Sequence, residues 1–214
     1  MTIKCLMCNP LQENCYVVSD ESRECVIIDC GAFYPEETDA LDRYLRDNNL
    51  RPMHLLATHG HLDHNLGNAA LYGKYGLKVE ICAEDQELVE RLDEQASSMF
   101  GIQLPGGQAP TGRLLRHGDT ISFGSHCLQV LRTPGHSHGS CLFYCPEEKA
   151  VFTGDTLFRM SIGRTDFAEG SWQEMETSLR DIVGRLPQHT TVYPGHGPQS
   201  SMADELRYNP YLRG

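Results

Sequence analysis

The stretch HLLATHGHLDH, residues 54–64, decides how the rest of the chain is interpreted. It begins with an apolar run and ends in three histidines and one aspartate. His59 and His61 are two residues apart, so in an extended or turning backbone their imidazoles lie on the same side and can converge on one point. Asp63 and His64 follow at once and must point elsewhere, which suits a second cation nearby. The stretch therefore favours a two-metal centre over a surface histidine cluster or a single structural zinc.

Further candidate ligands follow strand-like segments downstream. CLQVLRTPGH ends in His136, AVFTGD ends in Asp155, and TTVYPGH ends in His196. In each segment a glycine stands directly before the candidate ligand, and glycine supplies the backbone conformations that a tight turn needs. A single histidine after a strand is weak evidence for a ligand. Several in concert predict loops that meet at one edge of a sheet.

The motifs THGHLDH, TPGHSHGS, GDTLF and YPGHGP, in this order, resemble the metallo-β-lactamase superfamily, and within it the short glyoxalase II-like (hydroxyacylglutathione hydrolase-like) hydrolases. The resemblance covers nearly the whole chain. It implies an α/β fold, a four-layer αβ/βα sandwich in which two mixed sheets face each other with helices outside. It also implies a single domain over residues 1–214.

The resemblance also implies a ligand set and a cofactor. One metal ion is assigned to His59, His61 and His136, a second to Asp63, His64 and His196, and Asp155 bridges them. Asp63 and Asp155 are the catalytic carboxylates, Asp29 is a supporting acid at the edge of the site, and Arg164 binds the anionic part of the substrate. The expected cofactors are two divalent ions, with zinc preferred and iron or manganese as alternatives.

The leading function is hydrolysis of a small thioester, such as S-lactoylglutathione, by metal-bound hydroxide. The alternative is a mononuclear iron persulfide dioxygenase of the same superfamily, whose iron would be held by His59, His136 and Asp155. The segment GRTDF, residues 163–167, is found in both groups, so it leaves the choice open.

Composition narrows the class of partner. The net charge of −11 argues against a nucleic-acid surface, which needs clustered basic residues. No apolar run is long enough for a membrane span, and the N-terminus lacks a signal-peptide pattern. Nine scattered cysteines indicate buried reduced thiols. We expect a cytoplasmic monomer or homodimer that acts on a small molecule, without nucleic-acid or membrane partners.

Several local elements are expected from periodicity and capping. Residues 1–30 are typical of a β-meander, and helices are predicted at 35–49, from Asp63 to Gly76, at 84–97 and near 201–208. Ser171 and Glu174 form a capping box for a helix whose apolar face includes Trp172. The Gly- and Pro-rich stretch 99–112 suggests a mobile loop over the site.

Overall fold

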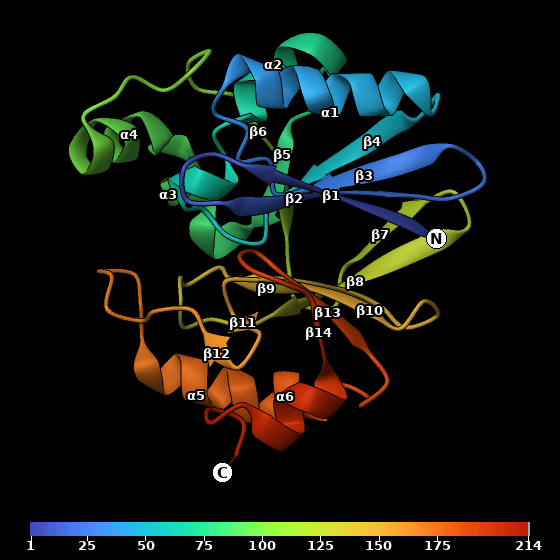
Figure 1. Ribbon diagram of the computed structural model, residues 1–214. Helices are drawn as coiled ribbons and strands as arrows, with labels where there is room; N and C mark the ends of the chain where they lie inside the picture. The colour runs from blue at the N-terminus through green and yellow to red at the C-terminus, as the bar shows by residue number, and fades with distance from the viewer. Residues whose placement is uncertain (214) are drawn as a thin grey trace.

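The computed structural model describes residues 1–213, apart from the side chain of Met99. Two six-stranded sheets face each other, and helices cover their outer faces (Figure 1). The helices α1 and α2 lie over the first sheet, while α5 and α6 lie over the second. The expected four-layer αβ/βα sandwich is confirmed.

The first sheet is built from the N-terminal half of the chain. Its strands, in spatial order, are β1 (Thr2–Cys8), β2 (Glu13–Ser19), β3 (Glu24–Ile28), β4 (Arg51–Leu56), β5 (Val79–Cys82) and β6 (Thr111–Leu115). β1, β2 and β3 form the expected antiparallel meander, and β3 to β6 continue as parallel strands. Parallel strands need crossover connections, which the helices provide.

The second sheet is built from the C-terminal half. Its strands, in spatial order, are β14 (Ser200–Ser201), β13 (Thr191–Pro194), β10 (Ala150–Gly154), β9 (Cys141–Cys145), β8 (His126–Arg132) and β7 (Thr120–Phe123). β10 and β13 are parallel and the remaining pairs are antiparallel. A small separate hairpin, β11 (Leu157–Phe158) and β12 (Ser161–Ile162), follows β10.

Two of the described helices, α5 and α6, begin with a serine side-chain cap. The helices are α1 (Pro35–Asp47), α2 (Asn68–Tyr75), α3 (Gln86–Glu90), α4 (Leu92–Phe100), α5 (Trp172–Asp181) and α6 (Met202–Tyr208), with single 3-10 turns at Leu62–His64, Ala83–Asp85 and Val183–Arg185. Pro35 occupies the first turn of α1, where its missing N–H costs nothing. Ser171 accepts a hydrogen bond from the Glu174 N–H and so caps α5, which is one half of the predicted capping box.

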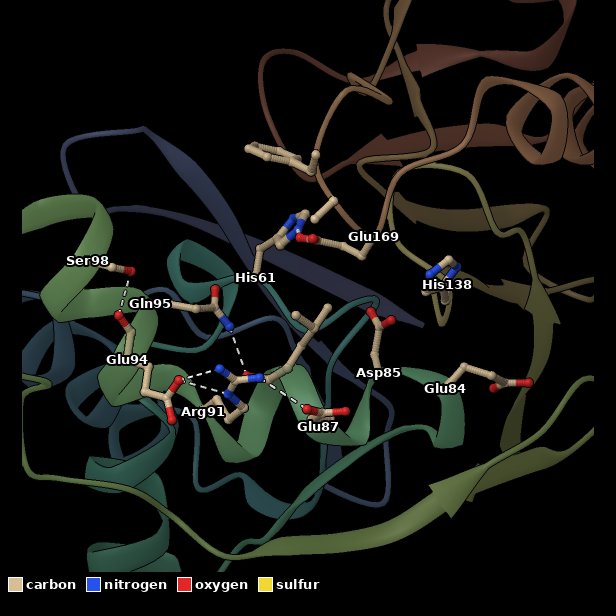
Figure 2. A pocket seen from close by; sticks show the side chains of 13 residues that line it. His61, Glu84, Asp85, Glu87, Arg91, Glu94, Gln95, Ser98, His138 and Glu169 are labelled. Carbon is tan, nitrogen blue, oxygen red and sulfur yellow. Dashed lines mark hydrogen bonds and ion pairs between the residues drawn. The ribbon is translucent and has the colours of Figure 1, made fainter.

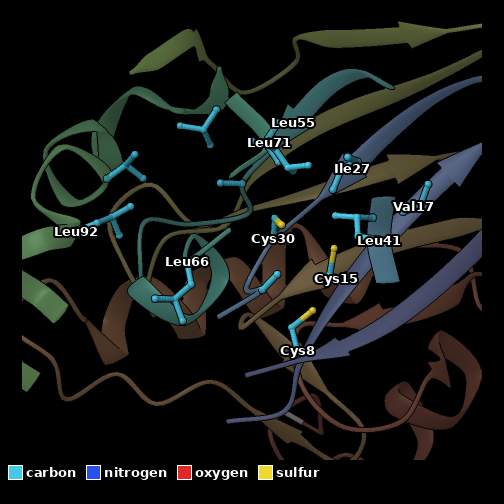
Figure 3. Packing of buried hydrophobic residues seen from close by; sticks show 14 of the residues in the cluster. Cys8, Cys15, Val17, Ile27, Cys30, Leu41, Leu55, Leu66, Leu71 and Leu92 are labelled. Carbon is cyan, nitrogen blue, oxygen red and sulfur yellow. The ribbon is translucent and has the colours of Figure 1, made fainter. Parts of the chain in front are cut away.

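Three apolar layers hold the sandwich together. Val17 packs under α1 and α2 with Leu41 and Leu71 (Figure 3), whereas its neighbour Val18 faces the space between the sheets with Phe152. This alternation follows from the two-residue period of a strand. A third layer lies between the second sheet and the helices α5 and α6. Both faces of each sheet are thus buried, which leaves the strand ends as the place for a site.

Three local predictions are wrong. The helix expected at 84–97 is split into α3 and α4, because Arg91 leaves the helical region at φ −117° and ψ 29°. Trp172 does not face the core: it is 45% exposed and stands edge-on to Tyr211. The helix expected to start at Asp63 begins at Asn68, so Asp63 lies in the separate 3-10 turn before it.

The cysteines agree with the expectation of reduced thiols. All nine are free, and most of them are buried in strands or directly after them. Among the helices that the structure describes, none has the length and apolar character needed to cross a membrane.

Candidate metal centre

The first ligand group joins the loop after β4 to the loop after β8. His59, His61 and His136 are buried, and one ring nitrogen from each lies within 4.8 Å of the other two. Nδ1 of His61 faces Nε2 of His136 at 2.9 Å. Three buried imidazoles that converge in this way form a donor set suited to a metal ion with open positions left for water or substrate.

The second ligand group joins the 3-10 turn Leu62–His64 to the loop after β13. Asp63, His64 and His196 each offer a ligand atom within 4.8 Å of the other two. Nε2 of His196 lies 3.2 Å from Nε2 of His64 and 3.2 Å from Oδ2 of Asp63. His59 also lies within 4.8 Å of His64 and Asp155, so the two groups adjoin each other, and the assignment of each residue to one ion stays a prediction.

Asp155 lies between the two groups, directly after β10. Its Oδ2 is 3.5 Å from Nε2 of His136 in the first group, and its Oδ1 is 3.3 Å from Nε2 of His64 in the second. The preceding Gly154 has a φ of +47°, and a Cβ atom there would come within 2.2 Å of Oγ1 of Thr58. Only glycine allows the sharp turn that presents this carboxylate to both groups.

The chemistry of the cluster fits cations. Nε2 of His59 and Oδ1 of Asp155 are buried without a hydrogen-bond partner, and such orphaned polar atoms are costly unless something binds them. Burial, together with nearby histidines such as His64, holds the pKa of His59 well below its usual value. Its imidazole is therefore neutral, which is the form that binds a metal.

The carboxylates of the cluster carry its negative charge. Burial alone would lower the pKa of His64. The carboxylates of Asp155, Asp63 and Asp29 outweigh burial and raise this pKa well above its usual value. The pKa of Asp63 is held low against the effect of burial, chiefly by His64 and then by His196. The dipole of α2 is not the cause, because α2 begins only at Asn68.

Asp29 lies against the second group, on the side of His64 away from the ligand atoms. Its Oδ2 is 3.0 Å from Nδ1 of His64, and its carboxylate accepts hydrogen bonds from the N–H and the hydroxyl of Thr58. Asp29 adopts a φ of +52° directly after β3. This contact fixes which nitrogen of His64 faces Asp63 and Asp155.

Glu169 makes the equivalent contact in the first group. Its Oε1 lies 2.7 Å from Nε2 of His61, which leaves Nδ1 of His61 turned toward His136. The hydrogen bond with His61 lowers the pKa of Glu169, so the carboxylate is ionised at neutral pH. The sequence analysis missed this residue, because nothing in the local pattern AEG relates it to a histidine 108 positions earlier.

Asp85 ties two ligand loops together and was also missed. It is fully buried and accepts hydrogen bonds from the N–H of Gly60, the hydroxyl of Ser137 and the N–H of Gly139. Gly60 lies between two ligand histidines, and Ser137 follows His136. The sequence offered no signal for this role, since Asp85 stands in an acidic stretch that is typical of a solvated surface.

Arg164 lies at the mouth of the site. Its guanidinium donates to both carboxylate oxygens of Asp166, at 2.6 and 2.8 Å, and stacks on the ring of Phe167. The same side chain lines a cavity of about 450 Å³ that also contains His136, Asp155 and residues of both ligand groups. The substrate contact assigned to Arg164 stays a prediction.

Two further cavities adjoin this central cavity. One, of about 700 Å³, shares His61, Gln95 and Phe167 with it, and acidic side chains surround much of it (Figure 2). The other, of about 210 Å³, shares Leu11, Leu62, Asp63 and Phe100 with the central cavity.

The stretch 99–112, which was predicted to be a mobile loop over the site, contributes to these cavities. Phe100 lines the central cavity, and Ile102 and Leu104 pack against the core under the first sheet. Whether the stretch opens and closes is not tested by the structure and stays a prediction.

Comparisons with known proteins agree with this fold. The chain is 33% identical to hydroxyacylglutathione hydrolase GloC of Haemophilus influenzae, over 99% of this chain and 98% of that protein. It superimposes on the crystal structure of BLEG-1 B3 metallo-β-lactamase with a TM-score of 0.90 and 31% identity, covering both chains completely. It is also similar to TTHA1623, solved in a di-iron-bound form, with a TM-score of 0.85 and 38% identity over 98% of this chain and all of that one.

The family model described as the metallo-beta-lactamase superfamily matches residues 8–196. This range begins at the end of β1 and closes on His196, so it contains all the side chains of both ligand groups. The chain belongs to the metallo-β-lactamase superfamily.

Proposed function

We propose that this chain is a hydrolase that uses two divalent metal ions to cleave a small thioester such as S-lactoylglutathione. The observation that carries the proposal is the position of Asp155, with one carboxylate oxygen toward each ligand group. The buried and unpartnered atoms of His59 and Asp155 support it, because a pair of bound cations would satisfy both.

Under this proposal the chain's own residues hold the ions and set their surroundings. His59, His61 and His136 hold one ion, Asp63, His64 and His196 hold the other, and Asp155 contributes to both. When bound, such a pair of ions lowers the pKa of a water molecule toward ~7 and polarises a substrate carbonyl. Asp29 and Glu169 keep the rings of His64 and His61 in the orientation that this requires.

The reaction is a hydrolysis in which water replaces the thiol. The C–S bond of the thioester breaks, a C–O bond to the water oxygen forms, and a carboxylic acid and a thiol leave. The central cavity of about 450 Å³ opens onto both ligand groups and has room for the reacting carbonyl. The similarity to hydroxyacylglutathione hydrolase GloC supports a thioester as the substrate class.

A second candidate is an iron-dependent persulfide dioxygenase. His59, His136 and Asp155 lie close enough together to form the arrangement of two histidines and one carboxylate that binds iron with positions open for oxygen. The similarity to TTHA1623, which was solved in a di-iron-bound form, supports iron as a metal to test in this candidate. The candidate requires oxygen as a co-substrate, whereas hydrolysis does not.

Oxygen dependence separates the two candidates. Protein loaded with zinc, iron or manganese is assayed with S-lactoylglutathione under nitrogen, and with glutathione persulfide in an oxygen electrode. Nitrocefin serves as a β-lactam control, and Asp155→Ala serves as the control for contaminating activity. We expect thioester cleavage at the same rate without oxygen. Negligible thioester cleavage together with persulfide-dependent oxygen uptake would overturn the hydrolase proposal.

A further inference from the structure

An apolar cavity beside the second ligand group has no role in the site as described so far. It has a volume of about 210 Å³, the volume share of about seven water molecules. Its walls are made by apolar side chains from four separate segments: Leu11, Phe33, Leu62, Leu66, Phe100 and Ile102. Asp63, a member of the second ligand group, also lines it, so the cavity reaches the candidate metal centre.

Two of the apolar side chains that line the cavity are exposed to solvent. Leu11 is 49% exposed and Phe100 is 46% exposed, and both also line the central cavity. Exposed apolar side chains that meet in a concave site next to reactive groups are typical of ligand pockets. A ligand that enters the central cavity can therefore bury them.

Two polar residues, Asn9 and Asp63, stand at the edge of this cavity. The side-chain amide of Asn9 donates to the carbonyl oxygens of Gly31 and Asp63, at 2.9 and 2.8 Å. Oδ2 of Asp63 faces His196. The remaining walls are apolar, so an acyl chain placed here would bury apolar surface along its length.

The cavity beside the first ligand group has a different character. Glu84, Glu87, Glu94 and Glu169 line it (Figure 2), and the cation Arg91 within it is paired with Glu87 and Glu94. An acyl chain therefore suits the apolar pocket, because contact with the acidic cavity would cost these carboxylates their hydration.

We propose that the apolar pocket binds the acyl chain of the substrate, so that thioesters of short- to medium-chain acids are cleaved more efficiently as the acyl chain lengthens. The proposal rests on the thioester hydrolase function put forward above. We expect the binding free energy to become more favourable with acyl chain length, because each methylene buried in the pocket contributes a similar amount.

The first test measures kcat/KM for S-acyl glutathiones from acetyl to octanoyl. In the wild-type enzyme we expect a rise of about four-fold per methylene, levelling off when the pocket is full. Phe100→Ala should flatten this rise, and Leu11→Ala should do so as a second variant. Tyr72→Ala, which removes a similarly exposed aromatic side chain on α2 away from the cavities, should leave the rise unchanged.

The second test does not depend on catalysis. Binding of the n-alkanoates from acetate to octanoate to the metal-loaded protein is measured by calorimetry, with the same variants. Affinity that rises with chain length in the wild type and in Tyr72→Ala, but not in Phe100→Ala, supports the pocket. If the same protein cleaves no thioester, the absence of cleavage refutes the hydrolase function and leaves the pocket supported. The acyl pocket is overturned if thioester cleavage or alkanoate binding does not depend on chain length. It is also overturned if the dependence on chain length is unchanged in both Phe100→Ala and Leu11→Ala. Thioester cleavage under either outcome still supports the hydrolase function.

Discussion

Replacement of Glu169 is the sharpest probe of how the first ligand group is held. The carboxylate lies 2.7 Å from Nε2 of His61, and its side chain is 22% exposed. Because Nδ1 of His61 faces His136, Nε2 carries the hydrogen that is donated to Glu169. Removal of the carboxylate frees the ring to rotate and to place its hydrogen on the nitrogen that should bind the ion.

The expected magnitude follows from the type of bond that is lost. Carboxylates that orient a ligand histidine typically contribute about 10- to 100-fold to metal affinity. Glu169→Gln keeps an oxygen that can accept from His61 but loses the charge, so we expect a loss of about ten-fold or less. Glu169→Ala loses the acceptor altogether, and we expect a loss toward the upper end, about 100-fold.

Metal affinity is measured by competition with a chromophoric chelator, and the cobalt(II) absorption spectrum reports the geometry of the bound ion. Glu174→Gln is the matched control, because Glu174 lies 3.6 Å from the exposed His138 and outside both ligand groups. The melting temperature of each variant shows whether the fold is intact. Equal affinity and an unchanged cobalt spectrum in wild type and Glu169→Ala would refute the reasoning.

Four other changes have defined outcomes. Arg164→Ala should raise KM more than it lowers kcat if the guanidinium binds the substrate, and an unchanged KM would restrict its role to the ion pair with Asp166. Asp85→Asn should lower the free energy of unfolding by about 3 kcal/mol in a urea titration, because an amide cannot accept all the hydrogen bonds of this buried carboxylate; a loss near zero would contradict this. The hydrogen bond to Glu80 raises the pKa of His54, so this pair contributes stability below the unfolded pKa of about 6.5 that is lost as pH rises through the folded pKa. His54→Gln should therefore cost more stability at pH 6 than at pH 9, and an equal cost at both would argue against the pair. Removal of bound metal with a chelator should lower the melting temperature by about 5–10 °C, since a ligand at ~100 times its Kd adds about 2.7 kcal/mol, and no shift would mean that the centre is empty or non-structural.

The parts of the site that sequence predicts are those with a local signature. The spacing of His59, His61, Asp63 and His64 after one strand implies two directions of binding, and the structure brings all four side chains into one cluster of overlapping candidate ligand groups. The glycine turn before Asp155 marks a strand end in the sequence itself. The order of the motifs, through family resemblance, gave the four-layer sandwich that composition and periodicity alone do not specify.

The parts that sequence does not predict depend on long-range contacts. Glu169 meets His61 across 108 positions, and Asp85 meets Gly139 across 54, so no local pattern records either contact. Trp172 fits the apolar face of α5 by periodicity, yet it is the first residue of the helix, stays 45% exposed and stands edge-on to Tyr211. Tertiary geometry decides these cases.

The central claim is that two divalent ions, held in part by a shared Asp155, are needed for catalysis. The most direct measurement is a titration of metal-free protein with zinc, iron or manganese, in which bound metal per chain and thioester cleavage are followed together. We predict binding of two ions per chain, with full activity reached at the second equivalent, and loss of both ions in Asp155→Ala. Saturation at one ion per chain with full activity, or two ions retained by Asp155→Ala, would contradict the account.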